Sequence, residues 1–184
     1  MEDNSFADIT FDKLTLSSFY QFITLIHYQA FGKSASTLRE LHCLTCRIQN
    51  QPPNYQVWNL LGQLTQLKII SVGFNVSEIP EFAIKPVNGQ ESQLELMAIL
   101  GQIHSIKSKA FYHLKKLNSI IISMSYLNKI EDQAFQFDHK LRGLTLLNVS
   151  SSLESFPNLN QMFDNFERVK LVISSPSIEN IPES

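Results

Sequence analysis

The residues best suited to chemistry in this sequence are two cysteines in the motif Cys43-x-x-Cys46. Such a pair can act as a redox couple when one thiol is exposed and has a lowered pKa. A structural zinc site needs four ligands, and the chain has neither a second cysteine pair nor histidines at ligand spacing. We expect no metal site, and we interpret the cysteines as buried core thiols, because the repeat described below directs both inward.

Other catalytic arrangements have little support. His42, Cys46 and an aspartate could form a hydrolase triad, but no nucleophile elbow accompanies them. Neither G-x-G-x-x-G nor G-x-x-x-x-G-K-[ST] is present, and the chain has six glycines in all, which argues against a nucleotide site. We therefore expect no catalytic residues, no cofactor and no enzyme activity. The formal net charge of −2 favours neither a nucleic-acid nor an anionic-membrane partner, and no apolar run is long enough to span a membrane.

The elements that must position these residues follow an internal repeat. Residues 102–113 and 126–137 share the phrase "Ile, three residues, Ala-Phe". Aligned on that phrase, Leu117, Ile120, Ile122, Leu127 and Ile130 fall at positions 1, 4, 6, 11 and 14, which is the leucine-rich repeat pattern. The fourth positions along the chain are Leu14, Leu41, Ile70, Met97, Ile120, Leu144 and Val172, with steps of 27, 29, 27, 23, 24 and 28 residues.

This spacing predicts an α/β fold in which residues 1–184 form a single domain of about seven repeats. Positions 4 and 6 lie two residues apart, so both point to one face of an extended strand, and neighbouring units must stack to bury that face. We expect a curved solenoid with a parallel, concave sheet and a convex side of loops, turns and short helices. Asn, which normally fills position 9, is replaced in several units, and Val149 there predicts an irregular turn.

The convex segments have their own signals. The Ala-Phe pairs predict that Phe111 and Phe135 stack in adjacent coils. Residues 57–64 have the spacing of a short amphipathic helix, residues 162–166 suggest one or two helical turns, and Asn88-Gly89 marks an exposed turn.

Over nearly its whole length the chain resembles the extracellular leucine-rich repeat family. More narrowly, the run "LRELHCLTCRIQNQPPNYQVWNLLGQLTQLKIISV", followed by "EIPEFAI", "SIKSKAF" and "KIEDQAF", is similar to arthropod proteins related to the non-catalytic subunit of oplophorus-luciferin 2-monooxygenase. The resemblance implies a secreted, non-enzymatic protein. The chain shows no signal peptide and no cysteine-rich caps, and it stops two residues after "ENIP", so we expect incomplete terminal caps, consistent with a shortened gene model, an isoform or a fragment.

The concave face is the best functional surface, because solenoids bind partners there and apolar residues on an open face can mark a binding patch. The alternative explanation for these apolar residues is that irregular repeats simply tolerate them, or that they rim the core. The candidate partner-binding residues are Arg39, His42, Leu44, Lys68, Ile69, Phe74, Leu96, Leu100, Ile121, Arg142 and Leu147. Asn148, in the sequon Asn148-Val149-Ser150, is the better glycosylation candidate, since Asn75 occupies an inward position.

We therefore expect non-catalytic protein binding in a receptor-like, matrix or accessory-subunit role outside the cell. Two alternatives stay open: an intracellular, cytoplasmic repeat adaptor, which the missing signal and free thiols would suit, and an accessory subunit of an oxidoreductase complex. A protein partner is expected in each case, and its identity does not follow from the sequence.

Overall fold

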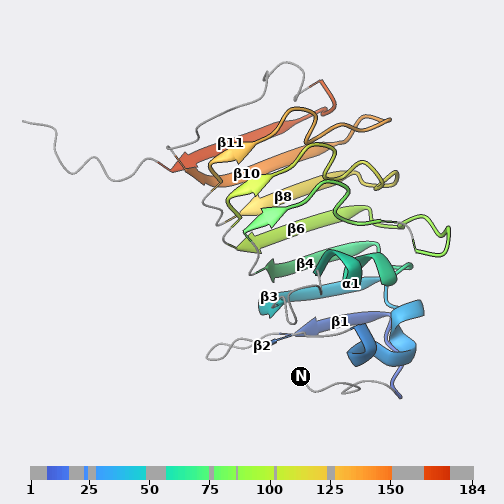
Figure 1. The fold of residues 1–184 in the computed structure, drawn as a ribbon. Coiled ribbons are helices and arrows are strands. Elements are labelled where there is room, and N and C mark those ends of the chain that lie inside the picture. The colour runs from blue at the N-terminus through green and yellow to red at the C-terminus, as the bar shows by residue number, and fades with distance from the viewer. Residues whose placement is uncertain are drawn as a thin grey trace, which may run out of the picture.

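Parallel strands stacked side by side form the body of the protein (Figure 1). The computed structural model describes residues 8–16, 23–24, 28–48, 57–74, 77–85, 87–101, 103–123, 127–150 and 164–174. The main sheet has the order β1-β3-β4-β6-β8-β10-β11, and the short strand β2 also pairs with β3. Apart from that pairing, each neighbour in the sheet is contributed by the next coil along the chain.

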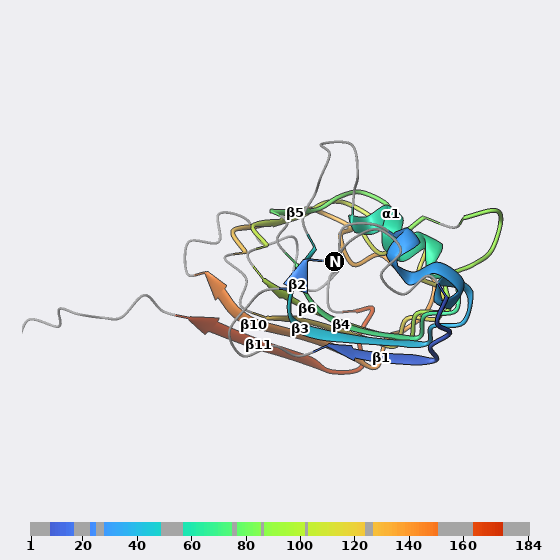
Figure 2. The ribbon, with the colours of Figure 1, turned by 90° about the horizontal axis from the view of Figure 1, so that it is seen from below.

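The strands of the main sheet are β1 (Lys13–Leu16), β2 (Ile23–Thr24), β3 (Glu40–Ile48), β4 (Ile69–Phe74), β6 (Leu96–Gly101), β8 (Ser119–Ser123), β10 (Gly143–Ser150) and β11 (Val169–Ser174). Three two-residue strands, β5 (Glu78–Ile79), β7 (Ser105–Ile106) and β9 (Lys129–Ile130), form a second parallel sheet. The helices are the 3-10 element η1 (Tyr28–Ser36) and α1 (Val57–Gln63). In Figure 2, α1 and β5 lie on the opposite side of the molecule from the strands of the main sheet.

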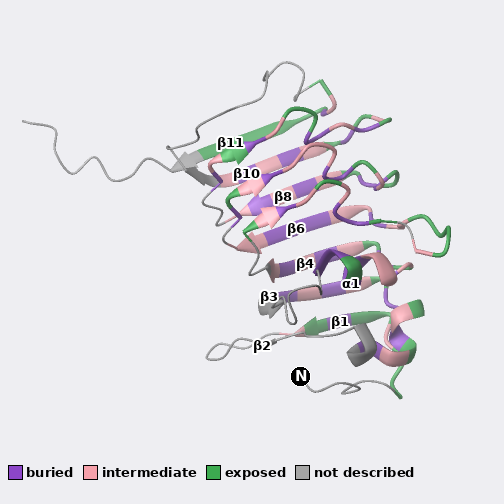
Figure 3. Ribbon diagram, in the orientation of Figure 1, coloured by how far each residue is buried: buried purple, intermediate pink, exposed green. Residues whose placement is uncertain are grey.

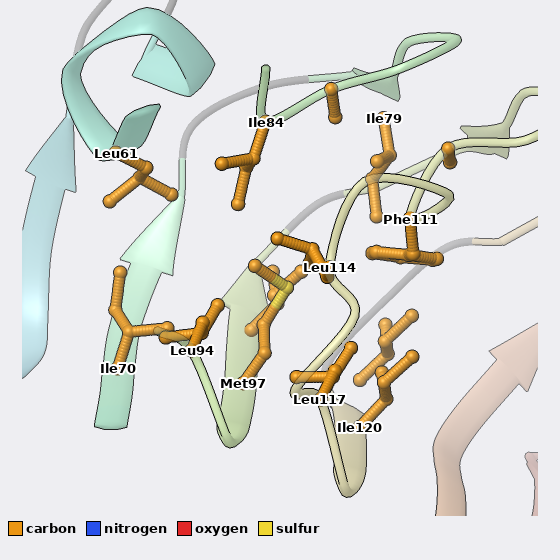
Figure 4. Packing of buried hydrophobic residues seen from close by; sticks show 14 of the residues in the cluster. Leu61, Ile70, Ile79, Ile84, Leu94, Met97, Phe111, Leu114, Leu117 and Ile120 are labelled. Atoms are coloured by element: carbon orange, nitrogen blue, oxygen red, sulfur yellow. The ribbon is translucent and has the colours of Figure 1, made fainter. Parts of the chain in front are cut away.

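The pairing register confirms the predicted inward rows. One row contains Leu14, Leu41, Ile70, Met97, Ile120 and Leu144, and the second contains Leu16, Cys43, Val72, Ile99, Ile122 and Leu146. All of these except Leu16 are buried. Figure 4 shows how Ile70, Met97 and Ile120 face residues from the other side of the coil, such as Leu114 and Phe111. The rows fill a continuous core because no single coil can cover its own aliphatic face.

The second side of each coil closes this core as expected. Phe111 and Phe135 are buried and stacked, with ring centroids 5.6 Å apart and planes 15° apart. Ala110 and Ala134 are also buried, which fits a close approach that a larger side chain would prevent. The predicted helix is present as α1, whose Trp58 packs in the core.

The exposed turn at Asn88-Gly89 is also present. Both residues have positive φ angles, 53° and 74°, and Gln90 N donates a hydrogen bond to the Val87 carbonyl. These angles favour Asn and Gly at the two central positions of a tight hairpin turn.

The last repeat was placed wrongly from the sequence. Val172 was assigned to the inward fourth position, but Leu144 pairs with Val169, so Val169 and Leu171 continue the inward rows. Val172 pairs with Leu147 instead, on the opposite face. The cause is local: Val172 fits the 28-residue step from Leu144, but that frame also turns Ser174 inward, whereas the observed pairing with β10 turns the aliphatic Val169 and Leu171 inward.

Two smaller expectations also need correction. The irregularity predicted at Val149 is a register shift between Leu147 and Val149 within β10, where the sequence led us to expect a turn. The helical turns predicted for residues 162–166 are wrong at Phe166, because this residue is buried and forms a parallel bridge with Leu141. Residues 162 and 163 lie outside the described part of the chain.

These observations establish a parallel-sheet repeat solenoid, with helices confined to short segments beside the sheet. The expected repeat architecture is confirmed at this level. Among the described residues, no helix is long and apolar enough to cross a membrane.

Candidate interaction face

The face of the main sheet that points away from the core presents three rows of side chains, and we call it the open face. The register assigns the rows, because paired residues of parallel strands point to the same side. The first row is Lys13, Glu40, Ile69, Leu96, Ser119 and Gly143; the second is Thr15, His42, Ser71, Ala98, Ile121, Thr145 and Lys170. The third contains Gly73, Leu100 and Ser123, with the pair Leu147 and Val172 farther along.

Aliphatic side chains gather in the middle of this face. Ile69, Leu96, Leu100, Ile121 and Leu147 are half-buried, although the core lies on the other side of the sheet. We call these five residues the apolar strip. Figure 3 shows intermediate and buried residues alternating along β8, whereas β6 is buried from Met97 to Ile99, including Ala98 of the open face, with Leu96 and Leu100 intermediate on either side. The strip therefore carries apolar surface that folding of the described coils leaves partly in contact with water.

Ion pairs cover the N-terminal end of the open face. Lys13 Nζ lies 2.6 Å from Glu40 Oε2, and His42 Nε2 lies 3.4 Å from the same oxygen. The hydrogen bond from Lys13 is the largest cause of a lowered Glu40 pKa. These side chains satisfy each other, so this end of the face offers little free charge to a partner.

Cations at the entrances of the first strands are also paired. Arg39 Nε lies 3.2 Å from Asp12 Oδ1, and Lys68 Nζ lies 3.1 Å from Glu95 Oε1. Each pair joins one coil to the next, since the acid precedes or follows the base by one repeat.

The C-terminal end differs. Arg142, Arg168 and Lys170 are exposed, and none of them has an ion pair within the described part of the chain. Lys170 is on the second row beside Thr145, and Arg168 directly precedes Val169, level with Gly143. Glu167, also exposed, is level with Arg142 beside the bridge between Leu141 and Phe166.

The structure thus brings together some of the predicted residues and separates others. Ile69, Leu96, Leu100, Ile121 and Leu147 share the open face with His42, whereas Arg39, Lys68 and Arg142 stand at the strand entrances. Leu44 and Phe74 belong to β3 and β4, but their side chains lie outside the described set, as does that of Asn148 in β10. Sequence reasoning missed Arg168 and Lys170; the correct frame of the last repeat would have placed Lys170 opposite Thr145.

Cys43 is fully buried, as expected, but it is disulfide-bonded where a free thiol was predicted. Cys46 is the only other cysteine of the chain. No group of three or more potential metal ligands occurs among the described residues.

Comparison with known proteins gives no match: neither a protein-family model, nor a curated protein, nor a solved structure corresponds to this chain.

Proposed function

We propose that this protein is a leucine-rich repeat protein that binds another protein through the open face of its main sheet. The apolar strip is the observation that carries this proposal. Burying it against a partner would remove aliphatic surface from water without disturbing the core, at about 25 cal/mol for each Å² covered. The repeat spacing and the two inward positions of each strand support the family assignment.

The proposal assigns no chemistry to the chain. The groups that approach one another on the open face form ion pairs at the surface, and this arrangement suits recognition better than turnover. An accessory role beside a catalytic chain is one version of the same binding function, and it predicts co-purification with that second chain.

We propose that the protein acts outside the cell. The disulfide at Cys43 favours an oxidising compartment over the reducing cytosol and so argues against an intracellular adaptor. In a secretory host, a glycan on Asn148 would be detected as a mass shift that Asn148→Gln abolishes. A chain that receives no glycan and carries free thiols when purified from its native source would favour the cytoplasmic alternative.

A binding selection tests the main proposal. The full chain is used as bait against a displayed library of protein fragments, and the ligands recovered are retested on Leu96→Arg/Ile121→Arg, which places charge in the apolar strip. We expect binding to fall at least about tenfold, because an unpaired charge would be buried at the contact.

The matched control places the same charges elsewhere. Ile9 and Tyr112 are exposed, 50% and 44%, and neither belongs to the open face. Ile9→Arg/Tyr112→Arg should bind like the wild type. If both double variants bind equally well, the open face is not the binding surface.

A further inference from the structure

Charge is distributed unevenly along the open face, and this asymmetry restricts the partner. At the N-terminal end, Lys13 forms an ion pair with Glu40, and His42 Nε2 lies 3.4 Å from the same carboxylate oxygen. At the C-terminal end, Lys170 belongs to the second row and Arg168 directly precedes β11, and neither has a carboxylate within 4 Å among the described residues. Among the described residues, a partner therefore finds unpaired positive charge at the C-terminal end of the open face.

The residues around this end do not neutralise it. Arg142 stands at the entrance of β10, and Glu167 is level with it. Counted over the described residues named here, three cations and one anion leave a formal excess of two positive charges at this corner, while the whole chain has a net charge of −2. The net charge of this corner is therefore positive, whereas that of the whole chain is negative.

The apolar strip begins next to these cations. Ile121 and Lys170 belong to the same row, with Thr145 between them, so they are two strand spacings apart, or about 10 Å. Leu147 pairs with Val172, the residue two positions after Lys170. One segment of a partner can therefore contact aliphatic groups and the cations at once, since about 10 Å corresponds to about three residues of extended chain.

We propose that the open face recognises a protein segment in which aliphatic or aromatic side chains are followed, about three or four residues away, by carboxylates. The apolar side chains cover the apolar strip, and the carboxylates pair with Arg168 and Lys170. Arg168 adds geometric selectivity, because a guanidinium can bind a carboxylate through two parallel hydrogen bonds. This inference rests on the proposed function and specifies the partner for the same surface.

A protein is favoured over nucleic acid or an anionic membrane. Both of those ligands require cations spread along the surface, and here the middle of the face is aliphatic while the other end is ion-paired. A ligand that combines apolar groups with few negative charges matches the face along its whole length.

The test is a selection with a defined probe. Random peptides of about 12 residues, long enough to cross the sheet when extended, are displayed on phage and selected on the full chain. The peptides that bind are synthesised with a fluorescent label, and their dissociation constants are measured by polarisation at low and at physiological salt. We expect enrichment of apolar residues followed by Asp or Glu, and affinity that falls as salt rises.

Two charge-reversal variants identify the contact. Arg168→Glu/Lys170→Glu should weaken the selected peptides by about tenfold to a hundredfold, mostly through slower association and lost charge pairs. Lys85→Glu/Lys116→Glu changes the net charge equally at exposed positions outside the open face and should leave the affinity unchanged. Circular dichroism of both variants confirms that each is folded.

The outcomes separate the two proposals. In one outcome, the selected peptides bind Leu96→Arg/Ile121→Arg more weakly but carry no excess of acidic residues, and their affinity is unchanged in Arg168→Glu/Lys170→Glu. That outcome would overturn this inference and leave the proposed function standing. Failure to recover any peptide that depends on the open face would contradict both. The same assay is run with a labelled single-stranded DNA and with phosphatidylserine vesicles. If either binds more tightly than the peptides through Arg168 and Lys170, the inference that the ligand is a protein segment is overturned.

Discussion

One residue in each of three successive coils adopts a left-handed backbone conformation. Phe82, Lys109 and Gln133 have φ angles of 51°, 52° and 61°, and each precedes the alanine of its coil. Phe82 N donates to the Lys109 carbonyl, and Lys109 N donates to the Gln133 carbonyl. Hydrogen bonds between the coils therefore hold these residues in the left-handed conformation, which costs any residue other than glycine roughly 1 kcal/mol or more.

Replacing Gln133 by glycine should relieve that cost. Gln133 is exposed, so Gln133→Gly loses little packing, and the gain is partly offset by the greater freedom of glycine in the unfolded chain. We expect the free energy of unfolding to stay constant or rise by up to about 1 kcal/mol in urea titrations. Asp132→Gly, at the exposed neighbouring position, should instead destabilise; equal losses in both variants would refute the explanation.

Ser34 is the buried polar side chain of the described core. Its Oγ accepts a hydrogen bond from Phe11 N at 2.9 Å and donates one to the Ile9 carbonyl at 2.6 Å, which attaches the segment before β1 to η1. Ser34→Ala should lower the free energy of unfolding by about 1 to 3 kcal/mol, since backbone groups lose their partner. Ser36→Ala, whose hydroxyl bonds at the surface, should cost much less, and similar losses would contradict this assignment.

His139 gives stability a dependence on pH. Burial of the ring opposes its charged form, but hydrogen bonds to the Asp138 carboxylate and the Leu117 carbonyl outweigh this, and the pKa of His139 is raised. Because the folded pKa exceeds the unfolded value, the stabilisation is complete below about pH 6.5 and is lost as pH rises through the folded pKa.

Denaturation midpoints of the wild type should therefore fall between mildly acidic and mildly alkaline pH, and those of His139→Gln should fall less. Asp138 acts in the opposite direction: its pKa is lowered, chiefly by the bond to His139, so its contribution is lost in acid. Lys115 is the other charge that acts on Asp138. If the denaturation midpoints of the wild type and of His139→Gln change with pH in the same way, His139 is not the cause of the pH dependence.

At the scale of elements, the inward rows could be predicted because the repeat spacing fixes which two positions of each strand face the core, and the first six repeats keep that spacing. The seventh repeat was misplaced by three residues: the chosen frame put Val172 and Ser174 inward, although Val169 and Leu171 supply the aliphatic pair. The same error concealed Lys170. Nor could the free charge be predicted: Arg39, Lys68 and Arg142 occupy similar places, and only the acids of neighbouring coils determine which one is paired.

Strand β11 forms the last strand of the described sheet, and three of its apolar side chains are partly exposed. Val169, Leu171 and Val172 are 37%, 36% and 39% exposed, whereas Leu144 and Leu146, their counterparts on the inward rows of β10, are buried (Figure 3). Within the described part of the chain β11 pairs with β10 alone, and an apolar edge strand of this kind favours association with other chains.

We expect the chain to self-associate as its concentration rises, and Leu171→Lys to reduce this, because a charge on the edge resists pairing with a second strand. Sedimentation velocity across a concentration series measures the effect. Tyr112→Lys, which removes an exposed aromatic side chain away from the edge, is the control and should associate like the wild type. If both variants associate equally, β11 is not the contact.

At the scale of the whole molecule, stability depends on contacts between neighbouring coils, since each strand pairs only with the next ones in the stack. In such a one-dimensional array a central coil has two interfaces and a terminal coil has one. The core reflects this: Met97 and Ile120 in the middle are completely buried, and Val169 at the end is not. The open face is therefore held most rigidly at the apolar strip and least at the cationic corner.

This gradient predicts the pattern of amide hydrogen exchange. Amides of β6 and β8 should open only with a free energy close to that of global unfolding, and those of β11 should exchange faster, through local fraying of the last coil. A peptide ligand of the open face should slow exchange in β11 more than in β6, because Arg168 and Lys170 would be held by the bound carboxylates. Equal protection of β6 and β11 in the free protein would mean that the stack opens as one unit, and the terminal coil would then be no weaker than the centre.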